Sequence, residues 1–299
     1  SQTGLRAVTG MLVGARLQCV WHHCRAHRFF SHARWSADEI GLRLAELIVD
    51  RFCGSEASVL VAVDDTLFHR LGRRVHGTFW HHDATANSRQ AAVAWGNNWV
   101  VVGIIVRLAF LDRSVCLPVL FRLWQPRRKQ YAATGRADPE RPGKVVLARE
   151  MIDLLAARLA GRRIDVVGDS AYVSEAWRGL DSQRVTITSR LRANAAIYAP
   201  RPPRTGKRGR PRKWGAKLGR LDQIASDPTT QWIEHDARRY GKTETLTLAE
   251  LDCLWEPLGP DTPVRVILVK DDTKPSGYQL VVFPRFEGHL SAFGESVES

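Results

Sequence analysis

The sequence predicts a mixed α/β fold, and three observations point to it. Short apolar runs typical of buried strands recur along the chain, beginning with VLVAV at 59–63. An amphipathic helix, predicted over 144–159, separates the first three of these runs from the later ones. A chain of 299 residues also has ample material for a large buried core.

The N-terminal region, residues 1–56, is predicted to be helical. Apolar residues recur there at helical spacing after the polar start at Ser36, at Ile40, Leu44, Leu47, Ile48 and Phe52. The first strand then follows at 59–63, where a continuous apolar run indicates burial on both faces.

The next elements follow the order of a ribonuclease-H-like sheet. Strands are predicted at 98–106 and 115–121, close enough to form a hairpin, and the helix over 144–159 follows them. Further strands at 164–169 and 185–188 have a short helix between them. Three antiparallel strands followed by helix-linked parallel ones predict that the first and fourth strands lie side by side.

The composition changes sharply after this predicted sheet. The stretch 201–220 holds nine basic residues and no acid, which indicates an arm or linker, and strands of a smaller β-rich subdomain are predicted after it. We therefore divide the chain into an N-terminal helical region, a catalytic core, a basic arm, a β-rich insertion subdomain and an unmatched tail, at 1–56, 57–190, 191–222, 223–283 and 284–299.

The charge balance favours a nucleic-acid partner. Forty-four basic residues against thirty-one acidic ones give a formal net charge of +13. No apolar stretch has the length of a membrane span, so a membrane partner is not expected. Five scattered cysteines, an odd number, favour a reducing compartment, and we expect a cytoplasmic protein.

Two predicted strands end in carboxylates, at Asp64-Asp65 and at Asp169. If these strands are adjacent and parallel, their acids meet at one sheet edge, where they could hold Mg²⁺ or Mn²⁺ for phosphodiester chemistry. Alternation along a strand places Asp64 and Asp65 on opposite faces, so only one of them can belong to such a site. The alternative is structural, since Asp169 with Ser170 could simply cap the following helix.

Four blocks of the sequence resemble one family of enzymes. They are VAVDDTLFHR from Val61, the stretch from His76 to Gly103, VVGDSAY from Val166, and KRGRPRKWGAKL from Lys207. In this order they resemble the bacterial insertion-sequence DDE transposases, also called DDE superfamily endonucleases.

The resemblance implies a ribonuclease-H-like core in which Asp, Asp and Glu hold two Mg²⁺ ions. By family position the first two acids are Asp65 and Asp169. The implied partners are double-stranded DNA at transposon ends and target sites, with a homodimer as a candidate assembly. A bacterial, nucleoid-associated location follows from the same resemblance.

The third acid of the family pattern is missing. Related enzymes carry Tyr, two residues, Arg, three residues and Glu on a helix, and none of the five tyrosines of this chain starts that pattern. The tail contains acids without the pattern, at Glu287, Glu295 and Glu298. We therefore expect a truncated and inactive copy. The alternatives are a non-catalytic DNA-binding fragment and a metal-dependent nuclease of the same fold with another acid set.

The basic arm contains a motif that resembles an AT-hook. Its residues are Lys207, Arg208, Gly209, Arg210, Pro211, Arg212 and Lys213. Glycine allows close approach to the floor of a groove, proline keeps the chain extended, and arginine is attracted to the negative potential of a narrow A·T-rich minor groove. A solvated charge run is the alternative, and it too would bind DNA through phosphates.

Two further patterns contain residue types that bind metal ions, but they are weaker. Cysteines and histidines gather between Cys19 and His27, but their spacing fits no established zinc finger. His81, His82 and Asp83 are expected in a loop between strands. Ser170 and Tyr172, beside Asp169, are candidates for supporting or substrate-contacting groups.

Overall fold

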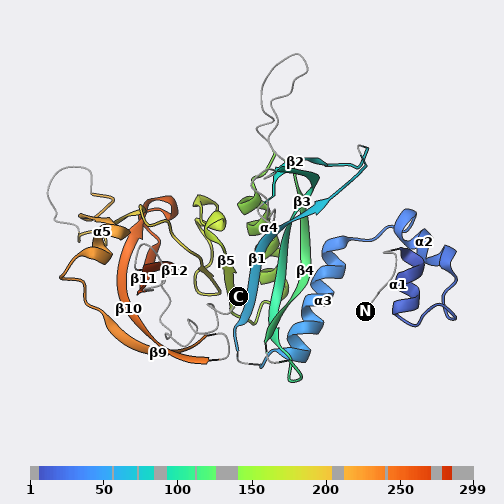
Figure 1. Ribbon diagram of the computed structural model, residues 1–299, viewed down its shortest axis with the longest axis horizontal. Coiled ribbons are helices and arrows are strands. Elements are labelled where there is room, and N and C mark those ends of the chain that lie inside the picture. The colour runs from blue at the N-terminus through green and yellow to red at the C-terminus, as the bar shows by residue number, and fades with distance from the viewer. Residues whose placement is uncertain are drawn as a thin grey trace, which may run out of the picture. The chain divides into compact units, whose positions relative to one another are not determined.

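The computed structural model describes residues 7–55, 57–72, 74–83, 93–111, 113–125, 141–203, 212–239, 242–270 and 278–284 (Figure 1). The chain divides into two compact units, residues 1–41 and 42–299. The first unit contains helices α1 (Val8–Gly14) and α2 (His23–Ser31), which contact each other, and the beginning of α3 (Ala37–Phe52). None of the helices among the described residues is long and apolar enough to cross a membrane.

Helix α3 confirms the predicted helix but buries a different stripe. Ile48 is buried as predicted, together with Leu42, Ala45 and Val49, whereas the other predicted core residues are exposed, namely Ile40, Leu44, Leu47 and Phe52. Ala45 is fully buried. Since a small side chain allows helices and strands to approach closely, the packed stripe follows Ala45 and not the largest apolar residues.

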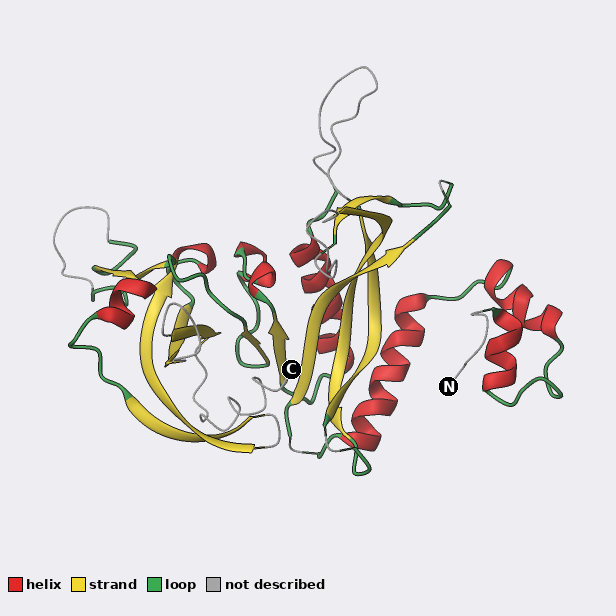
Figure 2. Ribbon diagram, viewed as in Figure 1, coloured by secondary structure: helices red, strands yellow, loops and turns green. Residues whose placement is uncertain are grey.

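The first sheet confirms the ribonuclease-H-like order, and Figure 2 draws its strands as yellow arrows. Its strands are β1 (Val59–His69), β2 (Phe79–His82), β3 (Val93–Arg107), β4 (Ser114–Trp124), β5 (Ile164–Gly168) and β6 (Val185–Thr188). The order is β2-β3-β1-β5-β6, with β4 also paired to β3. β1 is antiparallel to β3 and parallel to β5, so the first and fourth predicted strands do lie side by side.

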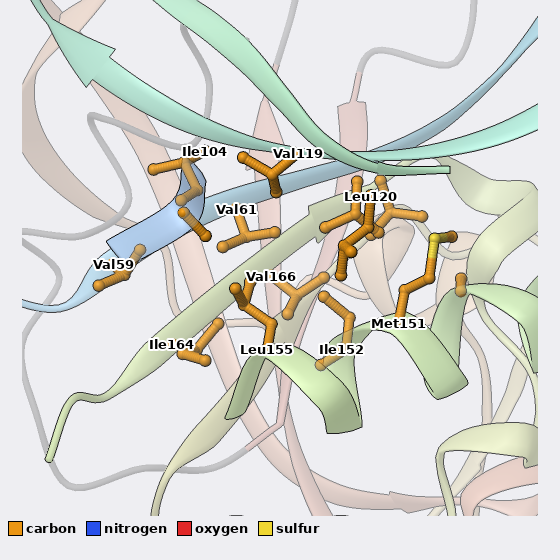
Figure 3. Close-up of a cluster of buried hydrophobic side chains, with 14 of the residues drawn as sticks. Val59, Val61, Ile104, Val119, Leu120, Met151, Ile152, Leu155, Ile164 and Val166 are labelled. Carbon is orange, nitrogen blue, oxygen red and sulfur yellow. The ribbon is translucent and has the colours of Figure 1, made fainter. Parts of the chain in front are cut away.

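The main core lies between this sheet and helix α4 (Lys144–Arg158). Figure 3 shows Met151, Ile152 and Leu155 of α4 facing buried side chains of the sheet such as Val61 and Val166. All five are essentially inaccessible to solvent. Complete burial of one aliphatic side chain of this kind stabilises a fold by about 1.5–3 kcal/mol, so this layer fixes the sheet firmly.

Three local predictions need correction. β1 does not end at its carboxylates but continues through Asp64 and Asp65 to His69. The stretch expected as a loop around His81 is strand β2, because it pairs with β3 from Phe79 onward. The short helix expected after Asp169 is two 3₁₀ turns, η1 (Ser170–Tyr172) and η2 (Glu175–Trp177).

A second sheet forms the β-rich part of the chain. Its strands are β7 (Ala196–Tyr198), β8 (Lys217–Arg220), β9 (Ile233–Arg239), β10 (Lys242–Trp255), β11 (Pro263–Lys270) and β12 (Tyr278–Pro284). The order is β12-β11-β10-β7-β8, with β9 also paired to β10. Helix α5 (Leu221–Ser226) and the 3₁₀ turn η3 (Glu256–Leu258) complete it. β7 and β8 fall inside the range assigned to the basic arm, and the five-part division stays a prediction.

Candidate functional site

The two aspartates of β1 lie just beyond the point where the pairing between β1 and β5 ends. The parallel pairing of β1 with β5 ends at Val63 opposite Gly168, while the pairing of β1 with β3 continues to His69. Asp64 and Asp65 are therefore held in the β3 ladder just beyond the end of β5, and Asp169 is the next residue after that strand. The predicted meeting of acids at one sheet edge follows from this register.

Asp64 and Asp65 occupy opposite faces of the strand, as alternation predicts. Asp65 has the same parity as the buried Val61 and Val63, and it is half-buried on the face that α4 covers. Asp64 is on the other face and exposed, and its Oδ1 accepts a hydrogen bond of 2.7 Å from the backbone N–H of Asp65. The two carboxylates therefore have different surroundings.

Three side chains contact the carboxylate of Asp65. The Lys144 ammonium lies 2.7 Å from Oδ2, and Nδ2 of Asn98 donates to the same oxygen at 2.9 Å. The Tyr172 hydroxyl donates to Oδ1 at 3.3 Å. These groups come from α4, β3 and η1, so three separate elements fix the orientation of one carboxylate.

Lys144 is the first residue of α4, and its ammonium group lies beside the carboxylate of Asp65. Its Nζ lies 4.8 Å from the centroid of the Trp124 ring, a cation–π contact. The helix has no acidic residue in its first turn, and Gly143 at the N-cap makes no side-chain hydrogen bond. A lysine at a helix N-terminus is unfavourable for the helix dipole, so the neighbouring carboxylate accounts for its position.

Asp169 also has a structural role. Its Oδ1 accepts a 2.8 Å hydrogen bond from the Ala171 N–H, which caps η1, and its backbone carbonyl accepts a 2.6 Å hydrogen bond from Ser189. Asp169 therefore caps η1, whereas the turn that begins after Ser174, η2, is capped by Ser174 itself. The Asp169 cap uses one carboxylate oxygen, and Oδ2 accepts no hydrogen bond from the described residues.

The acids influence each other electrostatically. The pKa of Asp64 is raised, chiefly because surrounding protein partly desolvates the carboxylate although the residue stays exposed, and further by the negative charges of Asp65 and Asp169. Burial, with the same three carboxylates nearby, also raises the pKa of the Tyr172 hydroxyl. Three carboxylates thus gather near one hydroxyl, and Lys144 is the cation that partly offsets them.

The residues present fit a hard divalent cation. Carboxylate oxygens are the ligands that Mg²⁺ and Mn²⁺ prefer, and three carboxylates against one ammonium leave excess negative charge. Two buried polar atoms on the Asp65 face, Nε2 of His81 and Oδ1 of Asn98, have no hydrogen-bond partner among the described residues. An ion with its bound water would satisfy such atoms.

Of the other predicted metal patterns, the run His81-His82-Asp83 places only His81 on the Asp65 face of the sheet. His81 is buried, His82 is exposed, and Asp83 lies 2.9 Å from Nε2 of His69. In the first unit, ligand atoms of His22, His23 and Cys24 lie within 4.8 Å of one another, and all three residues are exposed. Two of these groups already have partners within the cluster, since Nδ1 of His22 accepts from the Cys24 N–H and Nε2 of His23 contacts the Cys24 sulfur.

Most of the arm motif lies outside the described residues. This applies to Lys207, Arg208, Gly209, Arg210 and Pro211, and the tail acids Glu287, Glu295 and Glu298 also lie outside. Arg212 and Lys213 are described and exposed.

Sequence reasoning missed Asn98 and Lys144 as site residues. Both were assigned only to the start of a secondary-structure element. A basic residue at the N-terminus of α4, and a buried amide pair at Asn97 and Asn98 in an otherwise apolar strand, were the available signals.

Comparison with known proteins gives one family. The model of the family described as DDE superfamily endonuclease matches residues 2–251. That match includes both Asp65 and Asp169. No curated protein matches the chain significantly.

Proposed function

Because the chain belongs to the DDE superfamily endonucleases, we propose that it is the transposase of a bacterial insertion sequence, acting on DNA in the cytoplasm. The observation that carries the proposal is that Asp65 and Asp169 lie together just beyond the end of the β1–β5 pairing, where their carboxylate oxygens fit Mg²⁺ or Mn²⁺. The reaction is cleavage of phosphodiester bonds, followed by joining of the freed end to a target.

We assign Asp65 and Asp169 as the metal ligands. When bound, a pair of divalent ions activates water or a 3′-hydroxyl and stabilises the leaving oxygen. Asn98 and Tyr172 orient the Asp65 carboxylate, and the η1 turn orients that of Asp169. Lys144 neutralises part of the charge in the ion-free protein.

Metal binding tests this assignment directly. Asp65→Asn and Asp169→Asn keep the shape of each side chain and remove its charge, so each should weaken Mn²⁺ binding at least tenfold in calorimetry or electron paramagnetic resonance. Asp64→Asn is the matched control because the neighbouring acid points to the other face of β1. Equal loss in all three variants would contradict the assignment of Asp65 over Asp64.

The basic arm supplies a second, phosphate-directed contact. Replacing Arg208 and Arg210 with Ala should weaken duplex binding and reduce its salt dependence, because each phosphate contact contributes about 0.9 to the slope of log K against log salt. An unchanged affinity of this variant for duplex DNA would contradict the proposed role of the arm. Arg208 and Arg210 lie outside the described residues, and this proposal rests on the basic sequence of the arm.

A second candidate is a DNA-binding protein that does not cleave, since the basic balance of the chain supports DNA binding with or without cleavage. A strand-transfer assay with Mn²⁺ separates the two candidates. Joining of a pre-cut DNA end to a target supports the transposase, provided that Asp169→Asn abolishes it. Metal and DNA binding without cleavage or joining supports the second candidate.

A further inference from the structure

A groove of about 680 Å³ lies beside the segment that follows β5. Its wall starts at Ser170 and Ala171, the two residues that follow Asp169, and continues along the segment that connects β6 to β7. The other side is formed by residues at the end of β10 and in η3. The wall of the groove is therefore continuous in sequence with Asp169 of the candidate metal site.

Three arginines line this groove, and they differ in their partners. Arg178 donates to the backbone carbonyl oxygens of Pro257 and Glu256, at 2.8 and 3.3 Å, and lies 3.7 Å from Glu175. Its guanidinium group is thus occupied. In contrast, neither Arg190 nor Arg192 is paired with an acid among the described residues, although both are exposed.

The segment carrying Arg190 and Arg192 is anchored on both sides. Ser189, which is buried, donates to the Asp169 carbonyl, and Leu191 between the two arginines is buried in the core of the second sheet. Further along, the backbone N–H of Leu221 donates to the carbonyl of Ala195. The arginines therefore extend from a backbone that is already fixed, so binding there costs less ordering entropy than binding by a free loop.

We propose that this groove holds the sugar–phosphate backbone of the DNA strand entering the carboxylate site, with Arg190 and Arg192 bound to phosphates beside the one at Asp169. The inference rests on the proposed function, and it specifies the path along which the DNA strand reaches the carboxylates. Guanidinium groups bind phosphate oxygens through two parallel N–H donors, and such contacts position a strand without reading its sequence. The ends of β5 and β6 meet at one sheet edge, which places acids and arginines together.

The test measures DNA binding by Arg190→Gln, Arg192→Gln and the double variant of the full chain. The probe is a fluorescein-labelled duplex with a single-stranded 3′ overhang, followed by anisotropy over a salt series in EDTA. Each variant is also made in the Arg208→Ala, Arg210→Ala background, because the arm would otherwise contribute its own phosphate contacts. In the double variant, the magnitude of the slope of log K against log salt concentration should fall by about 1.4–1.8, which corresponds to the loss of two phosphate contacts.

Arg51→Gln is the matched control. This exposed arginine lies at the end of α3, and its neighbour Phe52 lines a pocket beside Leu60 near the amino end of β1. It is therefore at the opposite end of that strand from Asp65, and its replacement should leave the slope unchanged.

Arg190→Lys and Arg192→Lys should retain much of the salt slope but lose affinity, since lysine keeps the charge without the paired donors. An unchanged affinity and slope in the double glutamine variant would overturn the proposal.

The two proposals fail in different ways. Mn²⁺ binding should remain normal in the Arg190→Gln, Arg192→Gln variant, which also shows that the variant is folded. A wild-type protein that binds neither Mn²⁺ through Asp65 nor any DNA would contradict the proposed function itself. A wild-type protein that binds both, with no effect of the arginine changes, would reject the groove alone.

Discussion

The Lys144 ammonium lies 2.7 Å from Oδ2 of Asp65, so a residue of α4 occupies the side of the carboxylate that a cation would use. A metal ion approaching Asp65 must therefore compete with this ammonium. Both side chains are partly buried, which makes their pairing stronger than that of exposed surface ions.

Lys144→Gln should consequently tighten Mn²⁺ binding by about 1 kcal/mol, roughly fivefold, because the competing charge is gone. The same variant should be slightly less stable without metal. Calorimetric titration and thermal unfolding in EDTA measure the two effects. Weaker Mn²⁺ binding would indicate that Lys144 supports the ion and does not compete with it.

Asp64→Asn should stabilise the metal-free protein at neutral pH. The pKa of Asp64 is raised in the folded state, so its contribution to stability is full below the unfolded value of about 3.9 and is lost as pH rises through the raised pKa. The gain should stay below about 0.5 kcal/mol because the side chain is exposed to solvent screening. Unfolding in EDTA from pH 3 to 8 measures it, and the difference should persist in saturating Mn²⁺ because Asp64 is not assigned as a metal ligand. A gain that is constant down to pH 3 would point to a cause other than charge.

Tyr172→Phe should make stability less sensitive to alkaline pH. The raised pKa of the buried hydroxyl means that its contribution is complete below the unfolded value of about 10 and declines above it. Ultraviolet titration should accordingly show that Tyr172 ionises only when the protein unfolds, so the number of such tyrosines should fall by one in the variant. Loss of the hydrogen bond to Asp65 should cost about 1 kcal/mol at neutral pH.

Gly96→Ala should distort the strand pair that holds the acids. A Cβ atom at Gly96 would lie 2.3 Å from the backbone oxygen of Phe68, which cannot move without breaking the β1–β3 ladder. We expect a loss of about 1–3 kcal/mol in the free energy of unfolding, together with weaker Mn²⁺ binding. Gly161→Ala is the control, since nothing lies within 4 Å of its added carbon. Equal behaviour of the two variants would show that β3 does not constrain Asp65.

The strands of the first sheet could be predicted because burial on both faces leaves a continuous apolar run, as in β1 from Val59. The candidate site acids could be located for the same reason, because Asp64-Asp65 and Asp169 follow directly on apolar runs in which charged residues are rare. Asn98 and Lys144 could not be placed, because their contact with Asp65 depends on the register of β3 and the position of α4, and no local pattern encodes either.

The buried face of α3 shows the same limit of local reasoning. Leu44 and Leu47 have the spacing of a core stripe, yet the protein packs around Ala45. Small residues carry little hydrophobic signal, while close packing depends on them. Strand β2 could not be recognised from the sequence for a related reason. Its buried position is occupied by His81, a polar residue, so the sequence shows no alternation of apolar and polar residues.

β1 continues beyond the end of β5, and this difference in length gives the two acids different mechanical support. Asp65 is held in the ladder with β3, so its backbone position is set by the sheet. Asp169 is the first residue after β5, and it is held by the η1 cap and by the Ser189 hydrogen bond to its carbonyl. A change in the length of the segment after β5 would therefore displace Asp169 relative to Asp65, which would stay in the sheet.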